Sequence, residues 1–406
     1  MKRGRGPARG RGLAFAAVLL VAGCATAVVP DPRRPQLTAA EAAHLRVVDY
    51  LTAGAAPWQP RSLGALAAAT PDFVVAADGS GTHRSVQAAI DALPAAAPGA
   101  RRYLIHVRAG TYREVVCARA KAPFALVGVA GDAAAVTLVE GRYNGLAKRP
   151  GIDSANPCEP RLAEATYGTA GSASVALFSD DIALAHVTIA NDAHEPGPGR
   201  APPGASGGAQ AVALMTRGDR IQLEDVRLIG HQDTFYVRRG ADGGSARVHV
   251  RASLIAGDVD FVFGDATLVI EDSTLWSRAD RRGAESGGIV LAPSTLPGTA
   301  HGFLVVGSRF EGDPALAAGS VALGRAWDRG VAPGTWRAGV SPNGQALVRD
   351  SRLGPHIGGW AASTSRRSFT ATGESAHRLA EFNNRPAALR AADAVPPLNP
   401  PRASGG

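Results

Sequence analysis

Two carboxylates, two side-chain amides and one arginine stand out among otherwise apolar segments of the chain. They lie in four clusters: Gln210-Ala-Val-Ala-Leu214, Gly230-His-Gln-Asp-Thr234, Gly257-Asp-Val-Asp-Phe-Val-Phe-Gly264 and Leu323-Gly-Arg-Ala-Trp327. The interval from Gln210 to Gln232 is similar to the slightly longer interval from Asp233 to Asp260. If each interval is one turn of a repeating β structure, equivalent positions lie about 4.8 Å apart. The four side chains then converge on one face, where Arg325 can join them from a later turn.

This set of side chains suits ester hydrolysis without a serine. One carboxylate can attack a carbonyl carbon as nucleophile. A second, protonated carboxyl can give a proton to the leaving alkoxide and then act as base for water. Two carboxyl groups held close together have pKa values that separate, which supplies one group in each form. Glutamine amides can donate to the developing oxyanion. Glycosidases also use paired acids, but the glutamines and the arginine fit an acyl transition state better.

The elements that must position these side chains are short β-strands. From Phe73 onward, alternating apolar pairs are separated by a polar step, as in residues 182–189 and 221–228. The copies recur every roughly 20–40 residues, as in solenoid proteins, and each is too short to bury its own apolar face unless the copies stack. The pattern predicts an all-β chain folded as a right-handed, single-stranded parallel β-helix. A β-sandwich or a propeller is the alternative. A helix over 85–93, with Ser85 as its N-cap, is predicted to cap the N-terminal end.

The four clusters resemble the signatures of the pectinesterase (pectin methylesterase) family. Three further segments extend the resemblance over about residues 70–385, in family order: Phe73-Val-Val-Ala-Ala-Asp-Gly-Ser-Gly-Thr82, Gly110-Thr-Tyr-Arg-Glu114 and Glu381-Phe-Asn-Asn-Arg385. The resemblance implies a right-handed parallel β-helix that hydrolyses the methyl esters of polygalacturonate (pectin) to free carboxylates and methanol. It also implies that no metal or organic cofactor is needed.

Carried across residue by residue, the resemblance implies a role for each member of the clusters. Asp260 is then the nucleophile, and Asp233 is the general acid that becomes the base. Gln232 stabilises the tetrahedral transition state, and Gln210 assists it and contacts substrate. Arg325 binds Asp260 and substrate.

Several further residues are candidates for substrate binding. By the same resemblance, Trp327 stacks on a sugar ring, and Thr169 falls where the family often has a threonine that contacts substrate. Phe261 is next to the expected nucleophile, so we expect it to line the cleft. Tyr236 and Trp360 are candidates for sugar platforms, with packing as the alternative.

Two departures distinguish this chain from the usual family pattern. Ala326 stands where the family usually has proline, and the turn from Arg238 to Arg247 is longer than usual. The insertion around 144–169, together with the N-terminal segment, resembles the bacterial lipoprotein branch, some of whose members resemble acyl-thioester hydrolases with changes at the catalytic acids. Both acids and both glutamines are present here, which favours pectin as substrate. An acyl-thioester hydrolase on the same scaffold and a non-catalytic polysaccharide-binding β-helix are the alternatives.

The N-terminal segment is predicted to direct export. Residues 1–12 are basic, and a short apolar run from Leu13 to Ala22 follows. This layout is typical of a signal peptide, and the run is too short to cross a bilayer of about 30 Å. Val21-Ala22-Gly23-Cys24 resembles the bacterial lipobox, which implies a lipoprotein signal peptide at 1–23 and a lipid anchor on Cys24. Ala25 indicates, by resemblance to Gram-negative sorting, an outer-membrane lipoprotein facing periplasm or cell surface. An ordinary secretory signal is the alternative.

The charge of the chain is concentrated in this export segment. With 43 basic and 35 acidic residues the formal net charge is +8, and removal of the five basic residues up to Arg11 leaves 8 − 5 = +3. The basic excess therefore does not indicate a nucleic-acid partner. Hydrophobic residues make up 45% of the chain, which excludes an acidic disordered protein. We expect an exported monomer.

The remaining boundaries follow from composition. We expect a tether with a short helix (Ala39–Leu51) over 24–68, the catalytic β-helix over 69–390 and a flexible tail over 391–406. Cys117 and Cys158 belong to an exported protein, so a disulfide and two separate buried thiols both remain open. No cysteine or histidine spacing predicts a metal site.

Overall fold

A computed structural model describes residues 1, 31–53, 56–149, 153–195, 208–240, 243–244, 246–282 and 287–387. Apart from Met1, the predicted signal peptide, Cys24 and the predicted tail at 391–406 lie outside the described residues. Among the described residues, no helix has the length and apolar character needed to cross a membrane.

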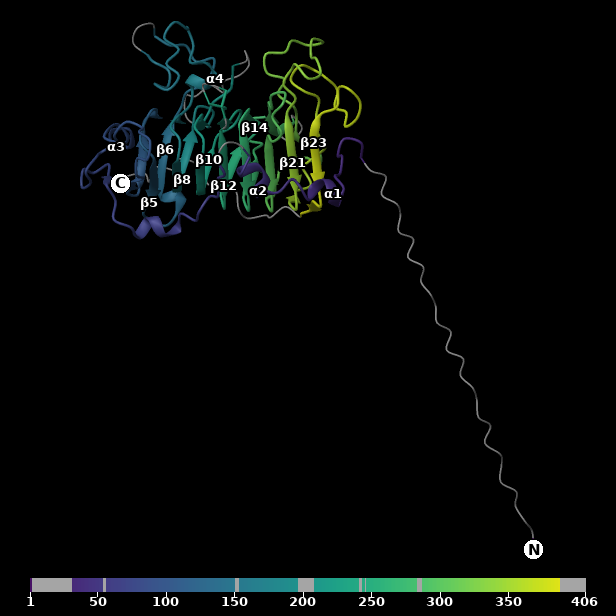
Figure 1. Cartoon of the computed structure of the whole chain (residues 1–406), viewed down its shortest axis with the longest axis horizontal. Coiled ribbons are helices and arrows are strands. Elements are labelled where there is room, and N and C mark those ends of the chain that lie inside the picture. Colours follow the sequence, from purple (N-terminus) through teal and green to yellow (C-terminus); the bar gives the residue numbers. More distant parts are fainter. Residues whose placement is uncertain are drawn as a thin grey trace. The chain divides into compact units, whose positions relative to one another are not determined.

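Parallel strands stacked in three ladders form the body of the described chain (Figure 1). The first ladder contains β1 (Phe73–Val75), β2 (Tyr103–Val107), β5 (Phe124–Gly128), β8 (Ile182–Asn191), β10 (Ile221–Ile229), β12 (Arg247–Arg251), β15 (Thr267–Glu271), β18 (Phe303–Val306), β21 (Gln345–Arg349) and β23 (Arg378–Phe382). The second contains β3 (Gly110–Arg113), β6 (Val136–Glu140), β13 (Leu254–Gly257), β16 (Thr274–Ser277), β19 (Arg309–Gly312), β22 (Arg352–Leu353) and β24 (Arg385–Pro386). The long strands β8 and β10 take part in both.

The third ladder forms a separate sheet. It contains β4 (Val116–Ala118), β7 (Val175–Leu177), β9 (Leu214–Thr216), β11 (Phe235–Val237), β14 (Val259–Gly264), β17 (Gly288–Pro293) and β20 (Val321–Gly324). Each strand of this ladder pairs in parallel with the strand one rung later. The parallel β-helix predicted from the sequence is therefore confirmed.

The polar step seen in the sequence repeats marks the corner between the first and second ladders. Residues at this corner adopt positive φ angles: His186, Asp225, Ala252, Asp272, Gly307, Asp350 and Asn383. L-residues rarely adopt the left-handed region, and Asp, Asn and Gly tolerate it best. One such residue per rung turns the chain from one ladder into the next, and the flanking apolar pairs become the two strands.

Apolar side chains stacked from rung to rung fill the interior. Ile221, Val248, Leu268 and Phe303 occupy equivalent positions on successive strands of the first ladder, and all are buried. The stack continues through Ala346 to Leu379. Because parallel rungs place equivalent residues side by side, repeated apolar positions in the sequence form one continuous core.

Helices cover the N-terminal end and part of the outer surface. α3 (Val86–Asp91) begins after Ser85, whose hydroxyl accepts a hydrogen bond from the Ala88 amide, so the predicted helix and its N-cap are confirmed. The other helical segments are α1 (Ala39–Ala42), α2 (Val47–Leu51), η1 (Gly64–Ala68), η2 (Ala133–Ala135) and α4 (Gly168–Gly171).

The described residues of the predicted tether pack against the β-helix instead of extending from it. The expected single helix over 39–51 is two short helices, α1 and α2. Tyr50 and Leu51 of α2 are buried against apolar residues that face outward from the first ladder, such as Leu304. Arg34 makes a bidentate ion pair with the buried carboxylate of Glu381. The prediction of a tether up to residue 68 is wrong for these residues, because the outer face of the sheet carries its own apolar stripe.

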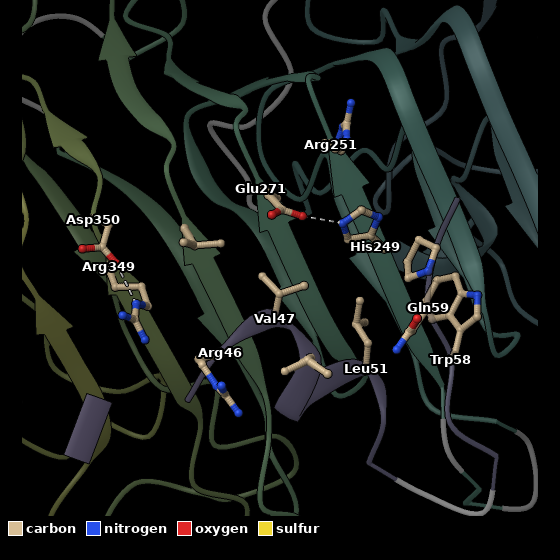
Figure 2. Close-up of a pocket in the computed structure, with 13 residues that line it drawn as sticks. Arg46, Val47, Leu51, Trp58, Gln59, His249, Arg251, Glu271, Arg349 and Asp350 are labelled. Atoms are coloured by element: carbon tan, nitrogen blue, oxygen red, sulfur yellow. Dashed lines mark hydrogen bonds and ion pairs between the residues drawn. The ribbon is translucent and has the colours of Figure 1, made fainter. Parts of the chain in front are cut away.

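A cavity of about 540 Å³ lies between α2 and the first ladder (Figure 2). Val47, Leu51 and Trp58 form its apolar wall, and the side chains of His249 and Glu271 rise from β12 and β15 and hydrogen-bond to each other. The predicted catalytic acids do not line this cavity. They lie on the third ladder.

Candidate active site

A polar cavity of about 530 Å³ opens on the outer face of the third ladder. The residues that decide its chemistry are Asn144, Glu159, Arg161, Thr169, Gln210, Gln232, Asp233, Tyr236, Arg238, Asp260, Phe263, Ala292, Arg325, Trp327 and Arg329. Eight of the ten residues predicted for catalysis or substrate binding are in this set. The other two, Phe261 and Trp360, are not.

The register of the third ladder brings the two carboxyls predicted to be catalytic to adjacent rungs. Phe235 of β11 pairs with Val262 of β14, and this pair has the same offset in the sequence as Asp233 and Asp260. The Asp233 amide donates to the carbonyl of Val259 across the same two rungs. The expectation that the interval from Asp233 to Asp260 is one turn of the β-helix is confirmed.

Both carboxyls are carried by backbone in an uncommon conformation. Asp233 has φ 67° and Asp260 has φ 48°. Asp260 also lies where the pairing of β14 with β17 shifts register between Val259 and Val262. Left-handed residues and bulges cost conformational energy and are concentrated at functional sites, where they aim a side chain. Here they turn both carboxyls into the cavity.

Arg325 orients Asp260 through a two-pronged ion pair. Its Nε donates to Oδ1 at 3.0 Å and its Nη2 donates to Oδ2 at 2.5 Å. Bidentate arginine–carboxylate pairs fix both distance and plane. Ala292 lies on the intervening rung, one position after the pair Leu291–Gly324, where it pairs with Phe263 and lines the same cavity.

Asp233 has a different environment from Asp260. Its residue surface is 7% exposed, and its carboxyl is not paired with an arginine in the way that Asp260 is paired with Arg325. Burial, followed by the negative charge of Asp260, raises the pKa of Asp233 well above its usual value, and the positive charge of Arg325 opposes the rise only in part. The site thus holds one proton-bearing carboxyl beside one arginine-bound carboxylate, which is the division of roles that acid–base and nucleophilic catalysis require.

The amide of Gln210 is oriented by a residue that the sequence argument missed. Asn144 Nδ2 donates to Gln210 Oε1 at 3.0 Å and to Thr169 Oγ1 at 3.0 Å. With its oxygen engaged, the Gln210 NH₂ group is the end that can donate to a substrate oxygen. In the sequence, Asn144 is distinguished only by the glycine that follows it. Its distance of 66 residues from Gln210 gave no local signal.

Three aromatic side chains form one wall of the cavity. The rings of Tyr236 and Phe263 stack at 4.2 Å with an interplanar angle of 14°. Trp327 meets Phe263 at 5.6 Å and Tyr236 at 6.0 Å. Tyr236 and Phe263 are paired positions on β11 and β14, so their stacking follows directly from the register. Trp327 therefore lies at the cavity, as expected. Tyr236 lines the cavity too, but it is only 4% exposed and packs in an apolar cluster with Phe263, so packing, the alternative for Tyr236, is also observed.

Phe261 and Trp360 do not reach the cavity, and both predictions are wrong. Phe261 is fully buried in the central core. Adjacent residues of a strand face opposite sides, so the neighbour of an outward-facing Asp260 points inward. The register shift then leaves Phe263, not Phe261, on the cavity side. Trp360 is only 2% exposed and packs in the same core beside Gly324.

Cys117 and Cys158 form a disulfide, which resolves the two possibilities left by the sequence. The bond ties the segment before α4 to β4 of the third ladder. Glu159, the next residue, enters the cavity and forms ion pairs with Arg217 and Arg238. The disulfide therefore helps to hold one side of the cavity. Among the described residues, no group of three or more His, Cys, Asp or Glu side chains could hold a metal ion.

Comparison with known proteins agrees with this geometry. The model of the family "Pectinesterase" matches residues 72–330. A pectinesterase from Ralstonia solanacearum is 37% identical over 381 residues, which cover 90% of this chain and 94% of the relative. Escherichia coli YbhC, whose name assigns it provisionally to acyl-CoA thioester hydrolases, is 30% identical over 349 residues, 79% of this chain and 76% of YbhC.

A solved structure shows the same architecture. The rice weevil pectin methyl esterase superposes with a TM-score of 0.73 at 28% identity, covering 88% of this chain and 98% of that one. The match of the family model to more than half of the chain, the high coverage of the Ralstonia relative and the shared fold lead to one conclusion. The chain belongs to the pectinesterase family.

Proposed function

We propose that this protein hydrolyses the methyl esters of pectin, with Asp260 as nucleophile and Asp233 as general acid and base. One observation carries the proposal. Asp260 is bound by Arg325, while Asp233, one rung away, is buried with its pKa raised. Family membership supports pectin as the substrate, because the relatives are pectinesterases.

In the first half of the reaction, the Asp260 carboxylate attacks the ester carbonyl carbon. The carbonyl oxygen becomes an oxyanion, which the side-chain amides of Gln232 and Gln210 stabilise by donating hydrogen bonds. The tetrahedral intermediate collapses, the bond to the methoxy group breaks, and Asp233 gives its proton to the leaving oxygen. Methanol departs, and the galacturonoyl group is left as an acyl anhydride of Asp260.

In the second half, water replaces methanol. Asp233, now a carboxylate, removes a proton from a water molecule as this attacks the anhydride carbonyl. Collapse of the second tetrahedral intermediate releases the free galacturonate carboxylate and regenerates the Asp260 carboxylate. Asp233 is again protonated. Arg325 keeps Asp260 in one orientation through both halves.

The walls of the cavity suit a charged sugar chain. The partly exposed ring of Trp327 offers an apolar face that suits a pyranose ring, and the buried, stacked rings of Tyr236 and Phe263 support it from one side. Arg161, Arg238 and Arg329 line the same cavity and suit galacturonate carboxylates. Thr169 lies beside Asn144 and Gln210, where its hydroxyl can contact substrate.

Methanol release from methyl-esterified pectin tests the proposal. The parent protein should release methanol, and Asp260→Asn and Asp233→Asn should each lose at least about 1,000-fold in kcat. Asp272→Asn is a matched control, because it changes a carboxyl at another left-handed position in the corner between the first two ladders. No methanol from the parent would refute the assignment, and turnover of an acyl-thioester in its place would favour the chemistry suggested by the name of YbhC.

We further propose that the protein is exported as a monomer and anchored to the outer membrane through a lipid on Cys24. The lipobox-like sequence around Cys24 supports this. Labelled palmitate should enter the parent protein but not Cys24→Ala, and fractionation should place the parent with outer membranes. A sedimentation measurement on the detergent-solubilised protein tests the monomer. A labelled Cys24→Ala protein would contradict the anchor.

A further inference from the structure

A buried ion pair lies behind the two catalytic turns and has no part in the mechanism above. Arg281 donates to both oxygens of Asp258, from Nε at 2.7 Å and from Nη2 at 2.9 Å. Their side chains are 10% and 2% exposed. Neither residue lines the active-site cavity.

Asp258 connects the turn that carries Asp260 with the turn that carries Asp233. Its amide donates to the carbonyl of His231 at 3.2 Å, and its own carbonyl accepts from Ile289 at 2.9 Å. Its side-chain Oδ1 also accepts from the amide of Val259 at 2.7 Å. Val259 in turn accepts from the amide of Asp233. One residue thus joins three consecutive rungs at the level of the catalytic carboxyls.

The segment that contains Arg281 also contacts the turn that carries Asp233. Arg278 donates to the carbonyl of Gly230 at 3.1 Å and forms ion pairs with Glu195 and Asp280. Asp280 lies 3.2 Å from Nε2 of the buried His231. The charged segment between β16 and β17 therefore contacts both the turn that carries Asp233 and the turn that carries Asp260.

The Asp258–Arg281 pair also acts on Asp233 electrostatically. The charged groups that face Asp233 are Asp260 and Arg325 on the cavity side and Asp258 and Arg281 behind it. Asp258 raises the pKa of Asp233, and Arg281 lowers it. The other titratable groups of the cavity and of this segment include Glu159, Arg161, Tyr236, Arg238, Arg329, His231, Arg278, Asp280, Arg282 and Glu195. Asp258 and Arg281 also act on the pKa of His194, which burial lowers to about 4.

We propose that Asp258 and Arg281 are positioning residues of this active site: their ion pair holds the two catalytic turns in register and balances the charge behind Asp233. Stability alone does not account for such a pair, because buried ion pairs can often be replaced by apolar side chains without loss. The expected changes in the kinetics rest on the proposed esterase function. The expected changes in the titration of Asp233 do not depend on that function, because they can be measured without turnover.

The two single substitutions within the pair should shift the pH profile of kcat/KM in opposite directions. A purely structural role would not produce opposite shifts. Asp233 must be protonated in the free enzyme, so kcat/KM falls as the pH rises through its pKa. Asp258→Asn leaves Arg281 uncompensated, so the alkaline limb should move to lower pH by about one unit. Arg281→Gln leaves Asp258 uncompensated, so the limb should move to higher pH. The double variant should return close to the parent profile, with kcat reduced in both single variants.

Glu381→Gln is a control, because it breaks another bidentate carboxylate–arginine pair, between the buried Glu381 on the first ladder and the partly exposed Arg34. It should lower the midpoint of thermal unfolding without moving the pH profile. Carbon-13 NMR of the Asp233 carboxyl, assigned with Asp233→Asn, should show the same opposite shifts without turnover. The proposal would be overturned if both single variants fold and the pKa of Asp233 is unchanged in them. It would also be overturned if that pKa shifts in the same direction in both variants. A parent that releases no methanol overturns the proposed function alone, because the NMR titration still decides this inference.

Discussion

Arg325 holds the carboxylate of Asp260 from two rungs away in the third ladder. The two parallel hydrogen bonds, at 3.0 and 2.5 Å, join residues 65 positions apart in the chain. Because Asp260 has positive φ at a register shift, the regular strand pairing does not fix the plane of its carboxylate. The guanidinium of Arg325 supplies that constraint.

Arg325→Lys should keep the positive charge but lose the planar fork that holds both carboxylate oxygens. We expect kcat/KM for methanol release to fall roughly 100-fold, with the free energy of unfolding changed by less than about 1 kcal/mol. Ala292→Leu tests whether a larger neighbour on the intervening rung disturbs this ion pair, because Arg325 and Asp260 themselves are intact in the variant. A comparable loss of activity is expected, and an Ala292→Leu enzyme with parental kcat would contradict the argument.

The raised pKa of Asp233 makes a prediction about stability as well as rate. A carboxyl whose pKa is higher in the folded than in the unfolded protein binds its proton more tightly when folded. The protein therefore loses stability as the pH rises from about 3.8, the ordinary value, through the folded pKa. Asp233→Asn removes the ionisable carboxyl, and with it this loss of stability at higher pH. Urea unfolding at several pH values should show the variant more stable than the parent at alkaline pH, with the difference shrinking towards pH 3.8. A difference that is independent of pH would contradict the assigned shift.

Asn144→Ala should impair catalysis through Gln210. Without the donor from Asn144, the Gln210 amide is free to rotate, and its NH₂ group is no longer directed at the oxyanion. We expect kcat to fall roughly 10-fold with KM nearly unchanged. A double-mutant cycle with Gln210→Ala is the control. If Asn144 acts through Gln210, its substitution should have little effect in the Gln210→Ala background, whereas additive losses would point to a separate role.

The Cys117–Cys158 disulfide should stabilise both the fold and the substrate cleft. It closes a loop with a sequence separation of 41 residues. Chain entropy then predicts that Cys117→Ala/Cys158→Ala loses about 4 kcal/mol of unfolding free energy. Because Glu159 follows Cys158 and pairs with Arg238 in the cavity, KM for pectin should also rise while kcat is largely kept. Reduction of the parent with dithiothreitol should reproduce both effects.

The two tryptophans proposed from the sequence as sugar platforms should now behave differently. Trp327 lines the cavity, so Trp327→Ala should raise KM for pectin roughly 10-fold with a small effect on stability. Trp360 packs in the core, so Trp360→Ala should lose about 3–5 kcal/mol of unfolding free energy. Below its midpoint of unfolding, the Trp360 variant should keep the parental KM. A raised KM in that variant would place Trp360 in the substrate path.

The sequence determined the fold and the reactive residues because both follow from repetition. Apolar positions repeat from rung to rung, and the polar clusters repeat at a similar interval, which predicts the side chains that become neighbours once strands stack in parallel. Asp233, Asp260, Gln210, Gln232 and Arg325 all line one cavity as expected. The helix after Ser85 follows from its N-cap, which is also a local signal.

The tertiary structure alone decided the details that depend on irregular or distant contacts. The register shift at Asp260 determines that Phe263, and not Phe261, faces the cavity, and no alternation rule gives its position. Asn144 and Gln210, and Asp258 and Arg281, meet because loops fold back across rungs. The segment before residue 68 packs on the outer face of the sheet because it meets apolar side chains that are distant in the sequence. The amino-acid composition of the segment alone does not predict this burial.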